Sequence, residues 1–243
     1  MHPFLAFFIV ALALGIALGM SPVNLLKAIQ NGIGGTLGSI VGIIALGSML
    51  GKLIGVSGAA QQISSKMIEW VGTKNIRWAF MLTGFIVGLP LFYSVGFMLI
   101  VPLAITVAHR HQLSAVYVSL PLLASLAVTQ GFLPPHPAPL YLTQQLHADM
   151  GKTLLYGIII SVPAILISGA WFGSTIKRYT TPPNLSFVAT ELPVAALPST
   201  LISFTAVLLP IILIGVSTLI TPYLEDGWLK SVFQFTGDAN VSL

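Results

Sequence analysis

The chain has 243 residues, of which 56% are hydrophobic and only 7% are charged, and its mean hydropathy is +0.95. Soluble domains carry about 25% charged residues, so this composition argues against a soluble enzyme and against a disordered scaffold. The net charge of +4 comes from scattered cations rather than from a basic patch, which argues against nucleic-acid binding. Cysteine is absent, which excludes disulfides, thiolate metal sites and cysteine nucleophiles. The composition is typical of an all-α, polytopic membrane protein that forms a single transmembrane domain over residues 1–243.

Charged residues divide the chain into apolar windows long enough to cross a bilayer, which takes about 20 residues in a helix. We expect spans near 3–20, 33–51, 154–173 and 201–221, with broken segments at 79–108 and 114–142. The first window has no cationic region before it, so we interpret it as a membrane helix and not as a signal peptide. Glycines recur at a spacing of four from Gly34 to Gly42, followed by Gly47 and Gly51, which predicts a helix face that another helix approaches closely.

Two shorter segments have a more polar pattern. Residues 59–71 place Ile63, Met67 and Trp70 on one helical face and polar residues on the other, which predicts an interfacial helix lying flat on the membrane, although an ordinary loop helix has the same pattern. Residues 180–198 form a polar connection that contains prolines, and Lys177-Arg178 precedes it.

The segments 79–108 and 114–142 are too long for one crossing and short for two crossings plus a polar loop, and both contain prolines. Proline removes a backbone donor and clashes with the preceding helical turn. The backbone groups freed in this way cannot face lipid and must be buried in protein or line a wet cavity. The pattern therefore predicts a re-entrant hairpin or discontinuous helices, which are the places where transporters bind substrates.

The first break is centred on the sequence Gly88-Leu-Pro-Leu-Phe-Tyr-Ser94. Pro90 would kink the chain, Phe92 would form an aromatic wall, and Tyr93 and Ser94 would offer hydroxyl groups. A helix that starts after this tip would direct its free N–H groups and positive dipole end towards an anion. A proline-kinked helix with a packed aromatic pair is an equally good interpretation of these residues.

The second break runs from Thr129 and Gln130 through Pro134 and Pro135 to His136, with two further prolines before residue 140. Four prolines in six positions forbid a regular helix. His136 is an ionisable group inside an otherwise uncharged window, which makes it a candidate for binding an anion or carrying a proton. The alternative is a polyproline linker at the surface with an incidental histidine.

Motifs for enzymes or metals do not appear in the sequence. A metal site built from His147 and Asp149 would lack ligands, and an intramembrane hydrolase would need a catalytic group that the spans do not offer. We therefore expect neither an enzyme nor a cofactor or metal.

The two breaks and their surroundings resemble the gluconate permease (gluconate:proton symporter) family of bacteria. The motif GFLPPHPAP at 131–139 is the most specific match, and the others are the glycine-rich stretch 34–64 and the segments 77–103, 116–121 and 147–157. The resemblance implies membership of the wider ion-transporter superfamily, with two inverted repeats, each containing a re-entrant hairpin and a broken helix. It also implies a multi-pass protein of the bacterial inner membrane that binds a sugar-acid anion through the residues of both breaks, namely Pro90, Phe92, Tyr93, Ser94, Thr129, Gln130, Pro134, Pro135 and His136.

By this resemblance the carboxylate would dock on backbone N–H groups and hydroxyls at Tyr93, Ser94 and Thr129, while Phe92 and the prolines shape the pocket. His136 would donate to the anion or carry the coupled proton. The family pattern has a glutamate where this chain has Ser94 and a histidine where it has Gln130, so proton coupling would depend on His136.

The resemblance also concerns length, because members of the family are nearly twice as long. We expect this chain to be one transporter repeat that works by self-association or with a separately encoded second half. The alternative is a truncated, non-transporting remnant or an assembly subunit of a split permease.

Overall fold

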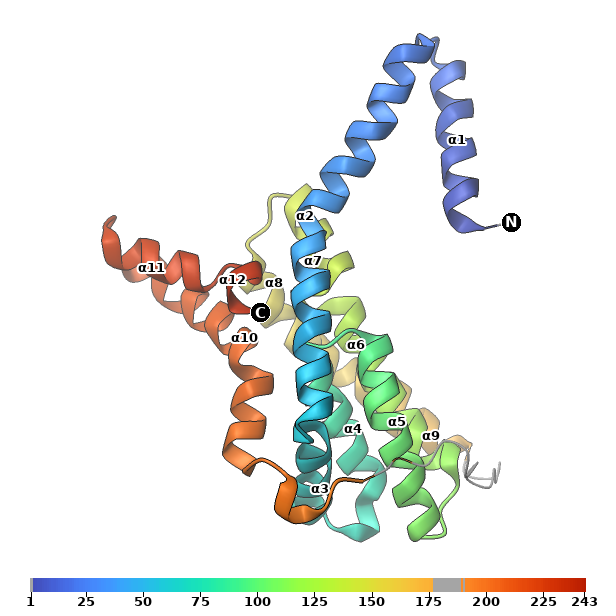
Figure 1. The fold of residues 1–243 in the computed structure, drawn as a ribbon, viewed down its shortest axis with the longest axis vertical. Coiled ribbons are helices and arrows are strands. Elements are labelled where there is room, and N and C mark those ends of the chain that lie inside the picture. Colours follow the sequence, from blue (N-terminus) through green and yellow to red (C-terminus); the bar gives the residue numbers. More distant parts are fainter. Residues whose placement is uncertain (1, 177–188, 190) are drawn as a thin grey trace. The chain divides into compact units, whose positions relative to one another are not determined.

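The computed structural model describes residues 2–176, 189 and 191–243. All regular elements in these ranges are helices, which confirms the predicted all-α class (Figure 1). Five helical segments are long and apolar enough to cross a membrane: Pro22–Val56, Tyr93–Arg110, Ala115–Gln145, Met150–Thr175 and Thr200–Tyr223. Contacts divide the chain into two units, residues 1–42 and residues 43–243.

The unit 1–42 consists of α1 (Pro3–Ala17) and the first part of the 35-residue helix α2 (Pro22–Val56). The side chain of Leu25 packs against Gly15, where a Cβ atom would clash with it. A Cβ atom added at Gly34 or Gly38 would meet nothing within this unit, so the first half of the glycine stripe mediates no close packing here.

The unit 43–243 holds the remaining helices. They are the end of α2, α3 (Ala59–Val71), η1 (Thr73–Asn75), α4 (Ile76–Gly88), α5 (Tyr93–Arg110), α6 (Ala115–Phe132), α7 (Pro137–Gln145), α8 (Met150–Ile165), the π-helical turn η2 (Leu166–Trp171), α9 (Phe172–Thr175), η4 (Val194–Ala196), α10 (Thr200–Ile220), η5 (Thr221–Tyr223), α11 (Trp228–Thr236) and α12 (Ala239–Ser242). The bounds of α3 agree with the helix expected at 59–71; its placement in the membrane interface stays a prediction.

The helices α4 and α5 form a hairpin along one side of α6. A Cβ atom on Gly84 would lie 2.7 Å from the carbonyl oxygen of Leu122, and one on Gly88 would meet Thr129, so α4 runs parallel to α6. Gly96 in the first turn of α5 packs on Leu126, which shows that α5 runs back in the opposite direction. The hairpin tip is the segment 89–92. The break after α6 lies next to this tip, and the nine-residue helix α7 continues the path of α6 beyond it.

Several prolines leave their helices unbroken. Pro102, Pro121, Pro163 and Pro210 lie inside α5, α6, α8 and α10. The hydroxyls of Thr106 and Ser125 donate to the carbonyl oxygens of Pro102 and Pro121 at 2.8 and 3.0 Å. A single proline removes one donor from the helix ladder and leaves the carbonyl four residues earlier without it, a loss that a helix packed within protein tolerates.

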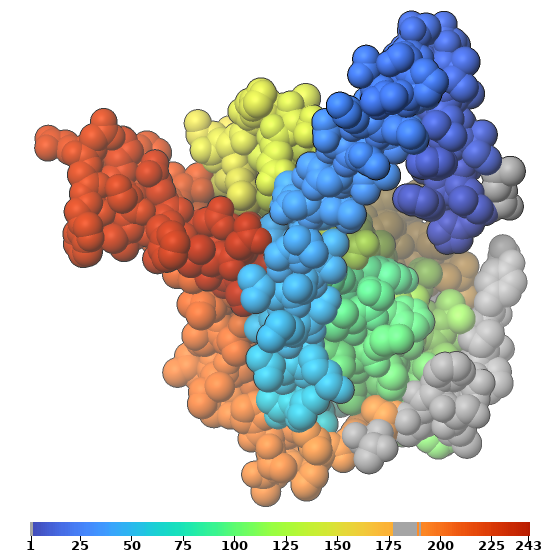
Figure 2. Space-filling view, turned by 45° about the horizontal axis from the view of Figure 1, so that its top comes forward, coloured from blue at the N-terminus to red at the C-terminus, as the bar shows by residue number. Residues whose placement is uncertain are grey.

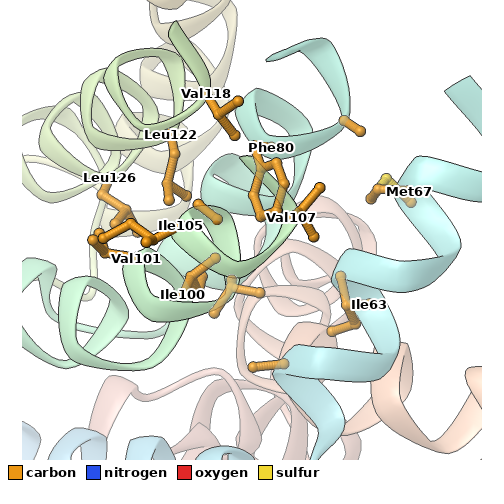
Figure 3. Close-up of a cluster of buried hydrophobic side chains, with 14 of the residues drawn as sticks. Ile63, Met67, Phe80, Ile100, Val101, Ile105, Val107, Val118, Leu122 and Leu126 are labelled. Atoms are coloured by element: carbon orange, nitrogen blue, oxygen red, sulfur yellow. The ribbon is translucent and has the colours of Figure 1, made fainter. Parts of the chain in front are cut away.

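The main hydrophobic core lies where the hairpin meets α3 and α6 (Figure 3). Phe80 and Ile100 of the hairpin are fully buried against Leu122 of α6. Ile63 and Met67 enter the same core from α3. The second half of α2 completes the packing, because a Cβ at Gly51 or Gly55 would clash with side chains of α5, and this half of α2 lies beside α5 in Figure 2.

The two ends of the 43–243 bundle differ in charge. One end, which we call the α3 end, brings together α3, the end of α5 and the start of α10, through the pairs Gln62–Thr200 and Arg110–Glu191. Its described charged residues are Lys66, Lys74, Arg77, Arg110, Glu69 and Glu191. The opposite end, the α11 end, joins the start of α8, the end of α10 and α11, and its described charged residues are Asp149, Lys152, Glu225, Asp226, Lys230 and Asp238. Lys177, Arg178 and most of the predicted connection 180–198 lie outside the described residues.

Candidate functional site

The two breaks predicted from sequence meet in the fold. The ring nitrogen Nε2 of His136 lies 2.9 Å from the carbonyl oxygen of Gly88, a residue 48 positions earlier in the chain. The backbone N–H of Tyr93 donates to Oε1 of Gln130. The ring of Phe92 packs on that of His136 with centroids 6.0 Å apart. Side chains of the second break thus bind the backbone on both sides of the hairpin tip.

The first break arises because α4 ends at Gly88 and Pro90 cannot supply a backbone donor. The backbone of Phe92 is extended, and α5 begins directly after it. The N–H groups in the first turn of a helix have no acceptor within that helix. The N–H of Gly96 bonds to the carbonyl of Phe92, and that of Tyr93 bonds to Gln130. The N–H groups of Ser94 and Val95 have no hydrogen-bond partner among the described residues.

The second break separates α6 from α7. Its backbone contains the cis peptide Pro134–Pro135, and His136 is the extended residue that precedes α7. Pro137 at the first helical position is compatible with the helix start because its missing N–H would have no partner there. The N–H of Leu140 bonds to the His136 carbonyl, while that of Ala138 has no partner among the described residues.

A cavity of about 720 Å³ lies at this junction. Its lining residues are Ile44, Phe92, Tyr93, Ser94, Ala127, Gln130, Gly131, Pro137 and Ala138. The first turns of both α5 and α7 therefore contribute to the wall, and the free N–H groups of these turns carry partial positive charge. Ser94 and Ala138 are exposed, so the cavity is open on one side within the unit 43–243.

The predicted site residues fall into two groups. Phe92, Tyr93, Ser94 and Gln130 line the cavity. Pro90, Thr129, Pro134, Pro135 and His136 are buried beside it and do not belong to its lining. The Thr129 hydroxyl donates to the Leu126 carbonyl at 2.9 Å and packs against Gly88, so it supports the hairpin from behind.

The hydrogen bond of His136 determines where its proton lies. A carbonyl oxygen can only accept, so Nε2 must carry the hydrogen that is donated to Gly88. In the neutral ring Nδ1 is then an acceptor, and this atom is buried without a partner among the described residues. The ring is 1% exposed and lies next to Phe92, one of the residues of the cavity wall.

Five residues of the lining did not emerge from the sequence as site residues: Ile44, Ala127, Gly131, Pro137 and Ala138. All are apolar or small, and they contribute shape and backbone rather than a reactive group. For Ile44 the sequence held a partial signal, because the spacing of Gly47 and Gly51 predicted that another helix packs closely against this stretch. In the structure these glycines pack against Phe92 and Val95, and this packing brings α2 and its Ile44 to the cavity.

The sequence profile of the GntP family permeases matches residues 1–243. The chain belongs to this family. It is 40% identical over 240 residues to the high-affinity gluconate transporter of Escherichia coli K12, covering 98% of this chain and 55% of that protein. A gluconate permease of Pseudomonas aeruginosa is 41% identical over 230 residues, with 93% and 51% covered. The Gnt-II system L-idonate transporter of Escherichia coli K12 is 38% identical over 242 residues, with 99% and 55% covered.

This GntP family chain therefore spans about half the length of the curated relatives it matches. No solved structure matches it. Membership confirms the resemblance predicted from the two breaks, and the five helices long enough to cross a bilayer agree with a multi-pass membrane protein of this permease family.

Proposed function

We propose that the chain is a component of a secondary active transporter for a sugar-acid anion such as gluconate, in the inner membrane of a bacterium. The observation that carries this proposal is the cavity at which two helix starts meet at the breaks of a hairpin and a discontinuous helix. Such discontinuous helices direct N–H groups towards anionic substrates in other transporters. The names of the relatives, gluconate and L-idonate transporters, agree with this substrate class.

In the proposed mechanism the carboxylate binds at the start of α5. The free N–H groups of Ser94 and Val95 and the Ser94 hydroxyl donate to it. Phe92 and Tyr93 form the walls that contact the carbon chain. The prolines Pro90, Pro134 and Pro135 keep the backbone out of helical form, so that these N–H groups stay available.

His136 is the proposed proton-coupling residue. Its Nε2–H holds the hairpin tip through Gly88, and its unpartnered Nδ1 can take up a proton without breaking that bond. A protonated ring behind Phe92 would add positive charge near the bound carboxylate and thereby favour joint binding of proton and anion. Thr129 supports the same tip by packing against Gly88 and does not contact substrate.

The open side of the cavity suggests how the transport unit is completed. The exposed Ser94 and the partly exposed Gln130 would be costly against lipid. We propose that a second, related half covers them, supplied by another copy of this chain or by a separate polypeptide. Movement of one half against the other would then provide alternating access.

The experiment is uptake of radiolabelled gluconate into proteoliposomes that contain the chain, alone and with the product of its neighbouring reading frame, under an inward proton gradient. The variant His136→Gln keeps a side-chain donor for Gly88 but has no site for a proton. We expect it to exchange gluconate across the membrane and to lose accumulation against a gradient. His109→Gln, at the exposed end of α5, is the matched control.

Accumulation by His136→Gln at the wild-type level would refute the role of His136. The absence of uptake in every combination would refute the transport proposal.

A further inference from the structure

Gln130 joins the two breaks, yet only one end of its amide group is used. Its Oε1 accepts the backbone N–H of Tyr93, and its side chain lines the cavity. Its Nε2 has no hydrogen-bond partner among the described residues. The orientation of this amide follows from the contact itself, because a backbone N–H can only donate and must therefore face the oxygen. The NH₂ group then projects from the other end of the amide and is available as a donor in the cavity.

The other residues that line the cavity indicate which kind of ligand this NH₂ group would bind. Within the described lining of the cavity there is no charged side chain. Free N–H groups occur in the first turns of α5 and α7, at Ser94 and Ala138. A fixed donor forms a stronger hydrogen bond with an ionised carboxylate than with a neutral hydroxyl group. The cavity therefore combines several oriented N–H groups with no opposing carboxylate, a chemistry that fits one negative charge on the ligand.

We propose that Gln130 is the specificity-determining residue of this cavity: its NH₂ group donates to the substrate carboxylate, while its Oε1, held by the N–H of Tyr93, fixes the direction of that donation. The residue would thus favour a sugar acid over a neutral polyol of the same length. This inference rests on the proposed function, since it concerns the same cavity and the same substrate class. It adds that the selection for charge comes from a neutral amide rather than from a cationic side chain.

The variant Gln130→Glu separates the two roles of the residue. A carboxylate oxygen can still accept the Tyr93 N–H, so the connection between the breaks is retained. The donor, however, is replaced by a second, negatively charged oxygen. Gln130→Leu removes both the acceptor and the donor. Gln145→Glu makes the same chemical change at an exposed position near the end of α7 and outside the cavity lining, and serves as the matched control.

Binding of radiolabelled gluconate to the purified full chain in nanodiscs, with unlabelled gluconate and sorbitol as competitors, gives the affinity and the preference for charge. We expect Gln130→Glu to weaken gluconate binding about 100-fold at about pH 8, because a hydrogen bond to a charged group is lost and a like charge is added. Sorbitol competition should change by less than about threefold, since sorbitol carries no charge. Lowering the pH to about 5 should restore part of the gluconate affinity as the introduced carboxyl group takes up a proton.

The possible outcomes are distinct. Equal gluconate affinity in wild type and Gln130→Glu, or equal losses for gluconate and sorbitol, would overturn the role of Gln130 while leaving the proposed function intact. An unfolded Gln130→Glu protein, recognised by a melting temperature far below that of Gln145→Glu, would show that the residue serves packing and would also overturn it. If the wild-type chain prefers sorbitol or binds neither ligand, the proposed function itself is refuted and the inference falls with it.

Discussion

The hairpin formed by α4 and α5 depends on a close approach to α6 at Gly84, and this approach gives a quantitative prediction. A Cβ atom at this position would lie 2.7 Å from the carbonyl oxygen of Leu122 and 3.1 Å from Cβ of Ser125. A backbone oxygen cannot rotate away, so α4 would have to move by about 0.5 Å to restore van der Waals distance. Overpacking of this kind costs about 1–3 kcal/mol, while alanine improves the helix by about 1 kcal/mol. We expect Gly84→Ala to lose up to about 2 kcal/mol in total.

Two further glycines calibrate this estimate. A Cβ at Gly88 would lie 2.5 Å from Oγ1 of Thr129, a buried, branched side chain whose hydroxyl is bonded to the Leu126 carbonyl, so Gly88→Ala should be destabilised at least as much as Gly84→Ala. Gly215 in α10 has open space around it, and Gly215→Ala should gain up to about 1 kcal/mol.

Thermal unfolding of the purified chain in detergent, with one substitution at a time, measures the series. For a chain of this length 1 kcal/mol shifts the melting temperature by about 2–4 °C. We therefore expect Gly84→Ala to melt up to about 8 °C below wild type and Gly215→Ala to melt above it. A Gly84→Ala protein that melts above the wild-type temperature, as Gly215→Ala should, would refute the close packing of α4 on α6.

Two other predictions concern the membrane and the core. Among the described residues, cations outnumber anions at the α3 end and anions outnumber cations at the α11 end, so the positive-inside rule predicts that the α3 end faces the cytoplasm. Because the chain has no cysteine, an impermeant maleimide added to intact cells should label Ser231→Cys on α11 and should label Thr73→Cys only after permeabilisation. The reverse labelling pattern would contradict this orientation. The buried hydroxyl of Ser161 has no partner among the described residues, whereas that of Ser203 donates to a backbone carbonyl at 2.9 Å. Ser161→Ala should therefore melt at or above the wild-type temperature and Ser203→Ala below it, and equal losses in the two would show that Ser161 has an unseen partner such as water.

The prolines show how far the sequence could predict the fold. Pro134 and Pro135 predicted a break, and the structure contains one, because adjacent prolines remove more donors than a helix can lose. Pro102 and Pro121 lie in the two segments that the sequence predicts to be broken, yet both are inside regular helices. Each of these single prolines leaves only the carbonyl four residues earlier without its N–H donor, and a helix packed within protein tolerates one such loss, whereas adjacent prolines end the helix.

The candidate site could be predicted in part for a similar reason. Window length indicated that 79–108 and 114–142 were broken, but it could not decide which was a hairpin and which a discontinuous helix. The direction of the chain after Gly88 depends on the contacts of Gly84 and Gly96 with α6, which are long-range. The sequence predicts His136 as an ionisable site residue; in the structure its donor faces Gly88 behind the cavity wall and not the cavity itself.

The backbone groups released by the two breaks explain why the junction suits an anion. The carbonyl of Gly88, at the end of α4, is bonded to His136 and is withdrawn from the cavity. The starts of α5 and α7, by contrast, both line it through Ser94 and Ala138, and their N–H groups have no partner among the described residues. Among the described lining residues, Gln130 and Gly131 of α6 alone belong to the C-terminal end of a helix, so two positive dipole ends oppose one negative end. The same prolines that forbid continuous helices therefore leave a site whose unpaired groups are chiefly donors, and a carboxylate is the ligand that would satisfy them.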